Sequence, residues 1–170
     1  MYYDMKPIMS GRLDFDEFIY RPDEKEISDI TKFYDDVKFT LPPEVKVTIQ
    51  NKAGYMTLKM ESELNISSHC ARCNEPAGLQ LTLNATKVIS DEIPEEENIE
   101  YIYMDEEKQI DITQAFGEQV VFDMPFKILC KDDCKGLCPV CGINLNKGTC
   151  DCAGKQVDPR LAILRTLLEN

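Results

Sequence analysis

Apolar residues recur at every second position over three stretches of the chain, residues 45–49, 55–66 and 79–84. This period of two is typical of half-buried β-strands. A break near Ser62 permits a bulge in the second stretch. The pattern therefore predicts a mainly antiparallel β-sheet.

A helix is predicted after Asp111, where the apolar spacing changes from two to three or four. The Asp111 side chain can cap the helix, and Gln114 three residues later would complete a capping box. Pro125 would end the helix. The apolar stripe expected to cover the sheet consists of Ile112, Ala115, Phe116 and Val120.

The C-terminal residues predict a second helix. Asp158 can cap it, and Pro159 occupies the favoured first helical position. The inward face would consist of Leu161, Leu164, Leu167 and Leu168. Residues 1–40 show no clear period and are left as strand, loop and short helix in open proportion. The expected fold class is α+β, a mainly antiparallel sheet with one or two covering helices and a C-terminal tail.

The chain has 170 residues, of which 43% are hydrophobic and 29% charged, and this composition is that of a globular protein. We expect residues 1–129 to form an acidic α+β domain and residues 130–170 to form a cysteine-rich tail packed on it. No apolar run approaches the ~18 residues that a membrane span needs. Residues 1–20 also lack a secretory signal. The expected protein is soluble and cytoplasmic.

Eight cysteines fall into four short pairs, and this spacing predicts metal binding. In Cys138-Pro139-Val140-Cys141-Gly142, the two-residue gap brings two sulfurs to one side of a turn. Gly142 can adopt the positive φ that turns backbone amides toward the thiolates. The candidate metal ligands are Cys70, Cys73, Cys130, Cys134, Cys138, Cys141, Cys150 and Cys152.

Eight cysteines suffice for two four-sulfur sites, so one or two zinc ions are expected. The favoured grouping places Cys70, Cys73, Cys130 and Cys134 on one ion and the other four cysteines on the second. In the alternative grouping, the Cys70 pair shares an ion with the Cys138 pair, because two-residue knuckles commonly pair with each other. Iron stays an alternative to zinc, since four-sulfur sites take both metals.

Buried free thiols or disulfides would be the ordinary interpretation of these cysteines. However, randomly placed core cysteines would not gather as short pairs around Pro and Gly, and disulfides need an oxidising compartment. His69 lies next to Cys70, but neighbouring residues of an extended chain point to opposite faces. We therefore do not expect His69 to be a ligand. Arg72 either balances the thiolate charge, contacts a partner or faces solvent.

The formal charge of −12 is concentrated before the cysteine-rich tail. Residues 1–129 carry 13 Lys and Arg against 26 Asp and Glu, whereas residues 130–170 carry 6 against 5. Residues 91–107 hold nine carboxylates and no basic residue. This stretch is interpreted as a solvated loop around a short strand, with a docking arm for a basic protein as the alternative. A chain this acidic is poorly suited to grip RNA alone, so a basic protein partner is favoured.

The cysteine motifs resemble those of the YceD family, also called DUF177, the large ribosomal RNA subunit accumulation proteins. The resemblance covers roughly residues 45–168. It is carried by the segments Cys70–Cys73, Cys134–Asn146, Cys150–Cys152 and Asp158–Leu161. It implies a non-enzymatic role in the synthesis, processing or stability of 23S ribosomal RNA. It supplies no catalytic residues.

The sequence thus favours a zinc-stabilised ribosome-biogenesis factor that binds a basic ribosomal protein or assembly factor, with ribosomal RNA present within a complex. No membrane and no small-molecule substrate are expected. One alternative is a direct RNA-binding zinc ribbon, with a basic face formed by Lys131, Lys135, Lys147, Lys155 and Arg160. A rubredoxin-like iron electron carrier is another. A radical enzyme with an iron–sulfur cluster is disfavoured, because too few residues follow Cys141 to form a barrel.

Overall fold

The computed structural model describes residues 1–32, 34, 36–91 and 100–152. Its contacts divide the chain into two compact units. The sheet unit comprises Met1–Ser68 and Gly78–Phe126. The cysteine unit comprises His69–Ala77 and the described part of residues 127–170. The proposed division at residues 129 and 130 stays a prediction.

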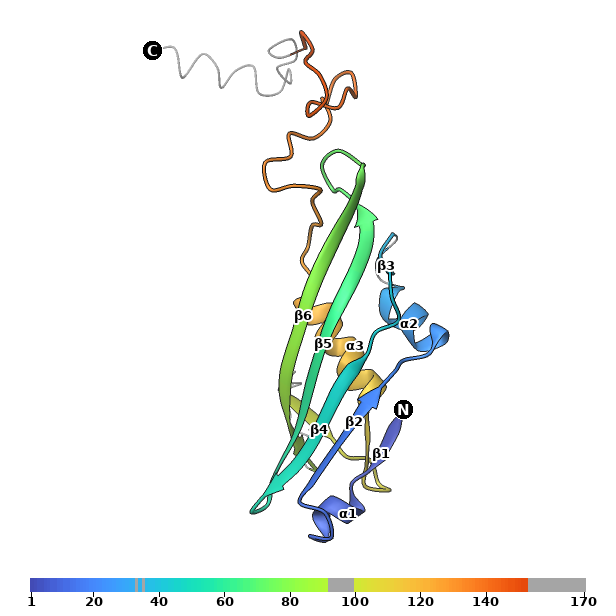
Figure 1. The fold of residues 1–170 in the computed structure, drawn as a ribbon, viewed down its shortest axis with the longest axis vertical. Coiled ribbons are helices and arrows are strands. Elements are labelled where there is room, and N and C mark those ends of the chain that lie inside the picture. The colour runs from blue at the N-terminus through green and yellow to red at the C-terminus, as the bar shows by residue number, and fades with distance from the viewer. Residues whose placement is uncertain (33, 35, 92–99, 153–170) are drawn as a thin grey trace, which may run out of the picture. The chain divides into compact units, whose positions relative to one another are not determined.

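A six-stranded sheet forms the centre of the sheet unit (Figure 1). Its strand order is β2-β4-β5-β6-β7, and β3 pairs with β5 beside this path. The pairs β2–β4, β4–β5 and β3–β5 are antiparallel, whereas β7 is parallel to β6. The strands are β2 (Phe15–Tyr20), β3 (Lys38–Phe39), β4 (Val45–Lys52), β5 (Tyr55–His69), β6 (Pro76–Ser90) and β7 (Tyr101–Tyr103). The expected α+β fold with a mainly antiparallel sheet is confirmed.

The buried face of strand β5 continues through Ser62, so the break in the sequence pattern at this residue does not mark a bulge. Leu58, Met60, Leu64 and Ile66 are buried, and Ser62 is buried on the same face. The Ser62 hydroxyl donates a hydrogen bond to the Glu44 carbonyl oxygen at 2.9 Å. Because this bond satisfies the buried hydroxyl, the strand continues without the change of phase that a bulge would bring.

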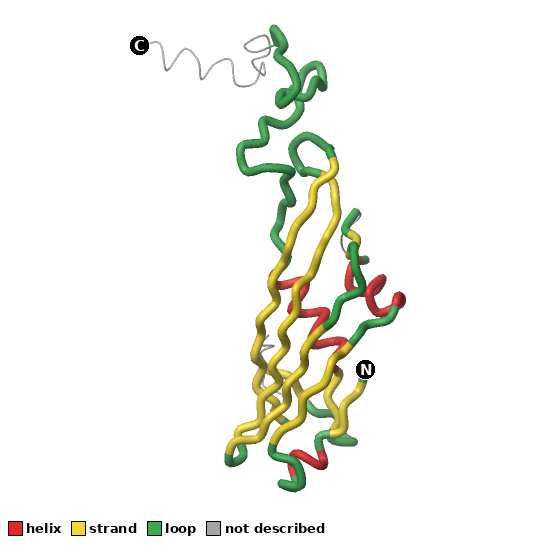
Figure 2. Tube along the Cα trace, viewed as in Figure 1, coloured by secondary structure: helices red, strands yellow, loops and turns green. Residues whose placement is uncertain are grey.

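Helix α3 (Ile112–Asp123) lies across one face of the sheet (Figures 1 and 2). The Asp111 side chain accepts hydrogen bonds from the amides of Thr113 and Gln114, so the predicted cap is confirmed. The expected capping box is wrong, because the Gln114 amide group donates to Glu118 at 2.8 Å. The predicted apolar stripe is buried: Ile112, Ala115, Phe116 and Val120.

The N-terminal 40 residues, which showed no clear period, form several short elements. Strand β1 (Tyr2–Asp4) pairs antiparallel with β8 (Gln109–Asp111) in a separate two-stranded sheet. Helix α1 (Lys6–Met9) follows, and helix α2 (Glu24–Thr31) comes after β2. A capping box is present in α2, between Asp23 and Glu26. These elements are short and bury few residues each, so their periods are too brief to read from sequence.

The core of the sheet unit contains aromatic and charged contacts as well as aliphatic packing. Phe116 of α3 is fully buried and packs edge-on against Tyr20 of β2, with ring centroids 6.0 Å apart. Lys87 of β6 is 1% exposed, and its ammonium lies 3.6 Å from the Glu118 carboxylate of α3. Burial of an ammonium requires such a partner. Burial also lowers the pKa of Lys87, and Glu118 partly offsets this.

Two expectations lie outside the described residues, wholly or in part. The predicted C-terminal helix after Asp158 falls entirely within residues 153–170. Residues 92–99 of the acidic stretch are also outside, while Tyr101–Tyr103 of that stretch form β7. Among the residues that the structure describes, no helix combines the length and apolar character that spanning a membrane requires.

Candidate metal centres

The first cysteine pair lies in the turn between β5 and β6. Strand β5 ends at His69 and β6 begins at Pro76. The Cys70 amide donates to the Glu75 carbonyl oxygen at 2.8 Å, and the Asn74 amide donates to the Cys70 carbonyl oxygen at 2.9 Å. Asn74 has a φ of 59°, which Asn tolerates better than most residues. This pair therefore caps the hairpin of β5 and β6.

The tail forms a second tight turn around Cys138 and Cys141. The Gly142 amide donates to the Cys138 carbonyl oxygen at 2.9 Å, and the Cys138 amide donates to the Ile143 carbonyl oxygen at 2.8 Å. Gly142 has a φ of 74°, the positive value expected from the sequence. Glycine is therefore the residue that closes this knuckle without backbone strain.

The eight thiols form two groups, and within each group all four sulfurs lie within 4.8 Å of one another. The first cluster consists of Cys70, Cys73, Cys130 and Cys134. The second cluster consists of Cys138, Cys141, Cys150 and Cys152. This grouping of sulfurs is the one that the sequence favoured. All eight cysteines are free thiols rather than disulfides.

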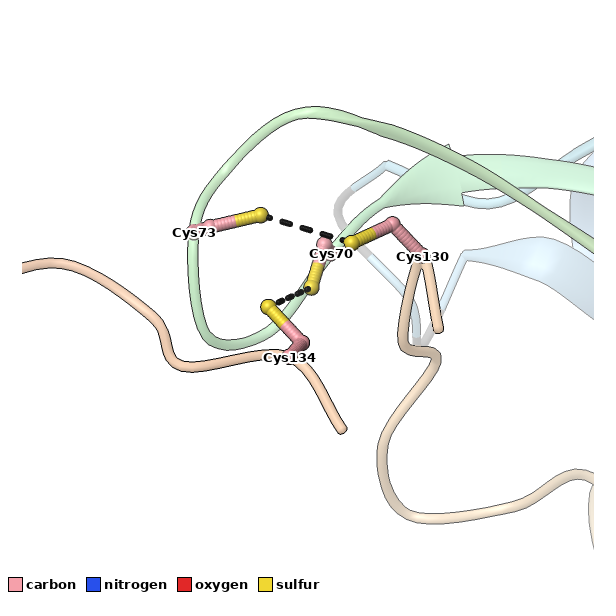
Figure 3. A group of neighbouring side chains, drawn as sticks. All are labelled: Cys70, Cys73, Cys130 and Cys134. Atoms are coloured by element: carbon pink, nitrogen blue, oxygen red, sulfur yellow. Dashed lines mark hydrogen bonds between the residues drawn. The ribbon is translucent and has the colours of Figure 1, made fainter. Parts of the chain in front are cut away.

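The sulfur separations of the first cluster suit a tetrahedral metal ion (Figure 3). The Sγ atoms of Cys70 and Cys134 are 3.7 Å apart, and those of Cys73 and Cys130 are 3.6 Å apart. Zinc–sulfur bonds of about 2.3 Å in a tetrahedron place sulfurs about 3.8 Å apart. A disulfide would bring two of them to about 2.0 Å. The spacing fits four thiolates around one ion.

Backbone amides are turned toward the sulfurs in both clusters. The Arg72 amide nitrogen lies 3.5 Å from the Cys70 sulfur. Amides two residues further along the chain also act to lower the pKa values of four other cysteines. These amides are Glu75 for Cys73, Gly136 for Cys134, Val140 for Cys138 and Cys152 for Cys150. Repeated N–H donation stabilises thiolates and is unneeded by buried neutral thiols.

The thiols of the first cluster differ in acidity. Burial opposes ionisation of Cys70, but backbone amides of Cys130, Arg72 and Cys73 outweigh it and lower the pKa of Cys70 to about 6. Burial and hydrogen bonding with Cys73 raise the pKa of Cys130 to about 12. Burial also opposes ionisation of Cys134, but hydrogen bonds, chiefly from the Asn146 side chain, outweigh it and lower the pKa of Cys134. Cys70 and Cys134 therefore ionise more readily than Cys130.

The second cluster shows the same division. Backbone amides of Cys141 and Val140 lower the pKa of Cys138 to about 6. Hydrogen bonding with Cys141 and burial raise the pKa of Cys152 to about 12. Four neighbouring thiolates repel one another, and a divalent cation at their centre removes that repulsion. Each cluster could hold a metal ion.

Two polar side chains, Asn146 and Arg72, lie beside the first cluster, and sequence reasoning missed the role of Asn146. The Asn146 amide nitrogen lies 3.3 Å from the Cys134 sulfur. The Arg72 guanidinium donates to the carbonyl oxygens of Asp132 and Cys134, at 3.3 and 2.9 Å. Nothing in the local sequence around Asn146 indicates this contact, because Cys134 lies 12 positions away. Arg72 does not simply face solvent.

Glycine at position 136 was also overlooked. Gly136 has a φ of 75°, and a Cβ atom there would lie 3.0 Å from the Arg72 carbonyl oxygen. The neighbouring Leu137 amide donates to that same oxygen at 3.0 Å. Both the positive φ and the close approach of two backbones therefore require glycine. The position of this glycine between Cys134 and Cys138 was the sequence signal that could have indicated a tight turn here.

The two clusters differ in burial. Cys70, Cys73 and Cys134 of the first cluster are buried, and Cys130 is exposed. In the second cluster only Cys138 is buried. His69 is exposed and belongs to neither group of sulfurs. A four-thiolate site leaves a tetrahedral ion no open position, so the arrangement suits a structural metal rather than a catalytic one.

The fold and the clusters define a class, an α+β protein whose two four-cysteine groups could hold metal ions. The chain belongs to the YceD family. The matching family model is described as large ribosomal RNA subunit accumulation protein YceD, and it matches residues 58–168. This range contains all eight cysteines.

Several proteins are similar over much of the chain. The large ribosomal RNA subunit accumulation protein YCED homolog 1, chloroplastic, of Arabidopsis thaliana is 25% identical over 82% of this chain and 53% of its own length. An uncharacterized protein of Mycobacterium tuberculosis is 31% identical over 58% and 49%. The uncharacterized protein YlbN of Bacillus subtilis is 23% identical over 98% and 94%.

The chain spans about half the length of the Arabidopsis and mycobacterial relatives. No solved structure matches.

Proposed function

We propose that this protein is a non-enzymatic, zinc-stabilised factor that supports accumulation of large-subunit ribosomal RNA by binding a basic ribosomal protein or assembly factor. The observation that carries the proposal is the pair of four-sulfur clusters in a chain of the YceD family. The names of the chloroplast relatives in Arabidopsis and maize point to the ribosomal process. The clusters supply the means of holding the cysteine unit in one conformation.

Zinc is proposed because each donor set consists of four neighbouring thiols with no open position, which is the donor set of structural zinc sites. Iron also accepts four thiolates, so the metal needs a direct test. Protein purified without chelator is expected to be colourless and to contain two zinc per chain by mass spectrometry. Strong thiolate-to-iron absorption in the visible spectrum would show that the metal is iron rather than zinc, and it would favour the electron carrier.

The acidic surface supports a basic partner. Residues 1–129 carry twice as many acidic as basic residues, 26 against 13. A zinc ion on four thiolates adds a net charge of about −2 at each site. Two basic residues of the cysteine unit are already paired with acids, Lys131 with Asp133 at 3.6 Å and Lys147 with Glu75 at 2.6 Å. These pairs weaken the case for direct RNA binding.

A pulldown from a bacterial lysate, with and without ribonuclease, tests the partner. The tagged, zinc-loaded chain is expected to retain a basic ribosomal protein or assembly factor after ribonuclease treatment. Retention that disappears with ribonuclease would instead favour the RNA-binding zinc ribbon. Recovery of neither would contradict the proposed function.

A charge-matched pair of variants then tests the acidic stretch as the docking arm. In one, Glu95, Glu96 and Glu97 are changed to Gln. In the control, the same number of exposed acids elsewhere is neutralised, by Asp14→Asn, Glu24→Gln and Asp29→Asn. Both variants lose three negative charges, so the first variant binds the partner more weakly than the control only if the acidic stretch contacts the partner. If the two variants retain the partner equally, the acidic stretch is not a docking arm, and the overall negative charge accounts for binding.

A further inference from the structure

The two clusters share one small loop system within the cysteine unit. Cys134 of the first cluster and Cys138 of the second are four positions apart. Residues 142–149, which join the two pairs of the second cluster, fold back onto the segment between the clusters. The Leu145 amide donates to the Gly136 carbonyl oxygen at 2.9 Å, and Leu137 and Asn144 form an isolated antiparallel bridge.

Asn146 lies in this loop, yet its side chain contacts the first cluster. Its Oδ1 accepts a hydrogen bond from the Lys135 amide at 2.9 Å. That bond orients the amide nitrogen toward the Cys134 sulfur, 3.3 Å away. The Asn144 side chain fixes Asn146 further, because its Oδ1 accepts from both the Asn146 backbone amide and the Asn146 side chain, at 3.0 and 2.9 Å.

A second polar link joins the same loop to the turn between β5 and β6. The Glu75 carboxylate accepts from Asn144 at 3.3 Å and from Lys147 at 2.6 Å. The Glu75 and Lys147 side chains are 42% and 67% exposed, so solvent screens this ion pair. Asn146 is only half-buried too, but it reaches a ligand sulfur. It is therefore the stronger link to the metal.

We propose that Asn146 is a positioning residue that couples the two metal centres, so that metal in the second cluster strengthens metal binding in the first. This inference rests on the proposed function, in which both clusters hold metal. Metal bound by the Cys141 and Cys150 thiolates closes the loop that carries Asn146 and holds its amide against Cys134. Without that metal the loop ends are no longer joined, and the N–H donor to the sulfur is lost more often. Coupling of binding free energies is reciprocal, so metal in the first cluster also strengthens the second.

A double-mutant cycle tests the coupling. Zinc affinity of the first cluster is measured by competition with a chelator in four proteins: the full-length wild type, Asn146→Ala, the pair Cys141→Ala with Cys152→Ala, and their combination. The NMR signal of the Ala71 amide reports the first cluster, because Ala71 lies between two of its ligands and donates to the Ile128 carbonyl oxygen.

Outer hydrogen-bond partners of metal ligands typically change metal affinity 10–100-fold. Asn146→Ala and loss of the second cluster are each expected to weaken zinc at the first cluster about 10-fold. Because both remove the same contact, the combination is expected to weaken it about 10-fold as well. A combined loss equal to the product of the two single losses would overturn the proposal. Wild-type protein that binds no zinc would instead overturn the proposed function.

Asn146→Asp guards against a variant that simply fails to fold. Aspartate keeps the acceptor for the Lys135 amide but replaces the N–H donor with a negative charge facing the sulfur. With Co²⁺ in place of zinc, the sulfur-to-cobalt absorption band of the first cluster is expected to shift in Asn146→Asp. It should stay unchanged in the control Asn84→Asp, which makes the same charge change on an exposed position of β6. An unchanged band in Asn146→Asp would also overturn the proposal.

Discussion

In the sheet unit most buried side chains are aliphatic or aromatic, and among the described residues they come from strands and from all three helices. In the cysteine unit, among the described residues, four of the six buried hydrophobic side chains are cysteines: Cys70, Cys73, Cys134 and Cys138, beside Ala77 and Ile128. Thiol burial alone supplies little stabilising area. Apolar packing therefore accounts for the stability of the sheet unit, and we expect metal bound at the two clusters to stabilise the cysteine unit.

The largest expected effect comes from removing one metal ligand of the cysteine unit. Structural zinc contributes an apparent ~10–16 kcal/mol in small zinc domains, as much as the stability of a whole domain. Cys138→Ala is expected to lose one zinc per chain by mass spectrometry. Amides over residues 127–152 should then lose their protection from hydrogen exchange, while those of the sheet unit keep theirs.

Val140→Ala is the matched control for that variant, because Val140 lies between Cys138 and Cys141 and is 47% exposed. It should keep its full zinc content. Simultaneous loss of protection in both units after Cys138→Ala would contradict separate sources of stability, and so would an unchanged zinc content.

A truncation in the apolar core should destabilise the sheet unit and leave the cysteine unit unchanged. Phe116 is fully buried against Tyr20, so Phe116→Ala is expected to lower the free energy of unfolding of the sheet unit by about 3–5 kcal/mol. Zinc content should not change. Urea denaturation followed by circular dichroism measures the loss. Phe122→Ala in the same helix, at a residue that is 66% exposed, should stay within about 0.5 kcal/mol of wild type.

The turn geometry of the cysteine unit can be tested at two glycines that have positive φ among the described residues, Gly136 and Gly142. Gly136→Ala combines strain at a φ of 75° with a contact of 3.0 Å to the Arg72 carbonyl oxygen, and about 2–3 kcal/mol of destabilisation is expected. Gly142→Ala has a similar φ of 74° and open space around the new methyl group, so about 1 kcal/mol is expected. Hydrogen exchange of the zinc-loaded protein compares the two. Equal effects would show that the close approach at Gly136 is unimportant.

The smallest predicted effect is an acid dependence of the sheet unit. Partial burial disfavours the Glu26 carboxylate, but hydrogen bonds from the Thr113 hydroxyl and the Asp23 amide outweigh it and lower the pKa of Glu26 to about 2. A carboxylate whose pKa is depressed on folding stabilises the folded state above its ordinary value of 4.5. That contribution is lost as the pH falls through about 2.

Glu26→Gln is therefore expected to flatten the decline in sheet-unit stability between pH 4.5 and 2, because Gln keeps an acceptor oxygen but does not titrate. Thermal unfolding at several pH values provides the measurement. Glu24→Gln, an exposed change in the same helical turn, should leave the decline as it is. A decline of equal slope in wild type and Glu26→Gln would assign it to other carboxylates.

Much of the fold was predictable because its long elements repeat a pattern. Strands β4 and β5 bury every second residue, and Asp111 caps the helix whose apolar stripe is buried. Where one residue broke the pattern, the prediction failed. Ser62 stays in the buried face because it bonds to Glu44, a contact 18 positions away. Lys87 is buried for the same kind of reason, since its partner Glu118 lies on another element.

The sequence alone determined the cysteine pairs and the glycine turn at Gly142, because short spacing and backbone conformation are local properties. Only the tertiary structure decided which pairs of sulfurs meet, since Cys70 and Cys134 are 64 positions apart and the sequence favoured one grouping but left the other open. It also decided the contact of Asn146 with Cys134. Such contacts depend on where the folded backbone returns to itself, and no local pattern of residues encodes that.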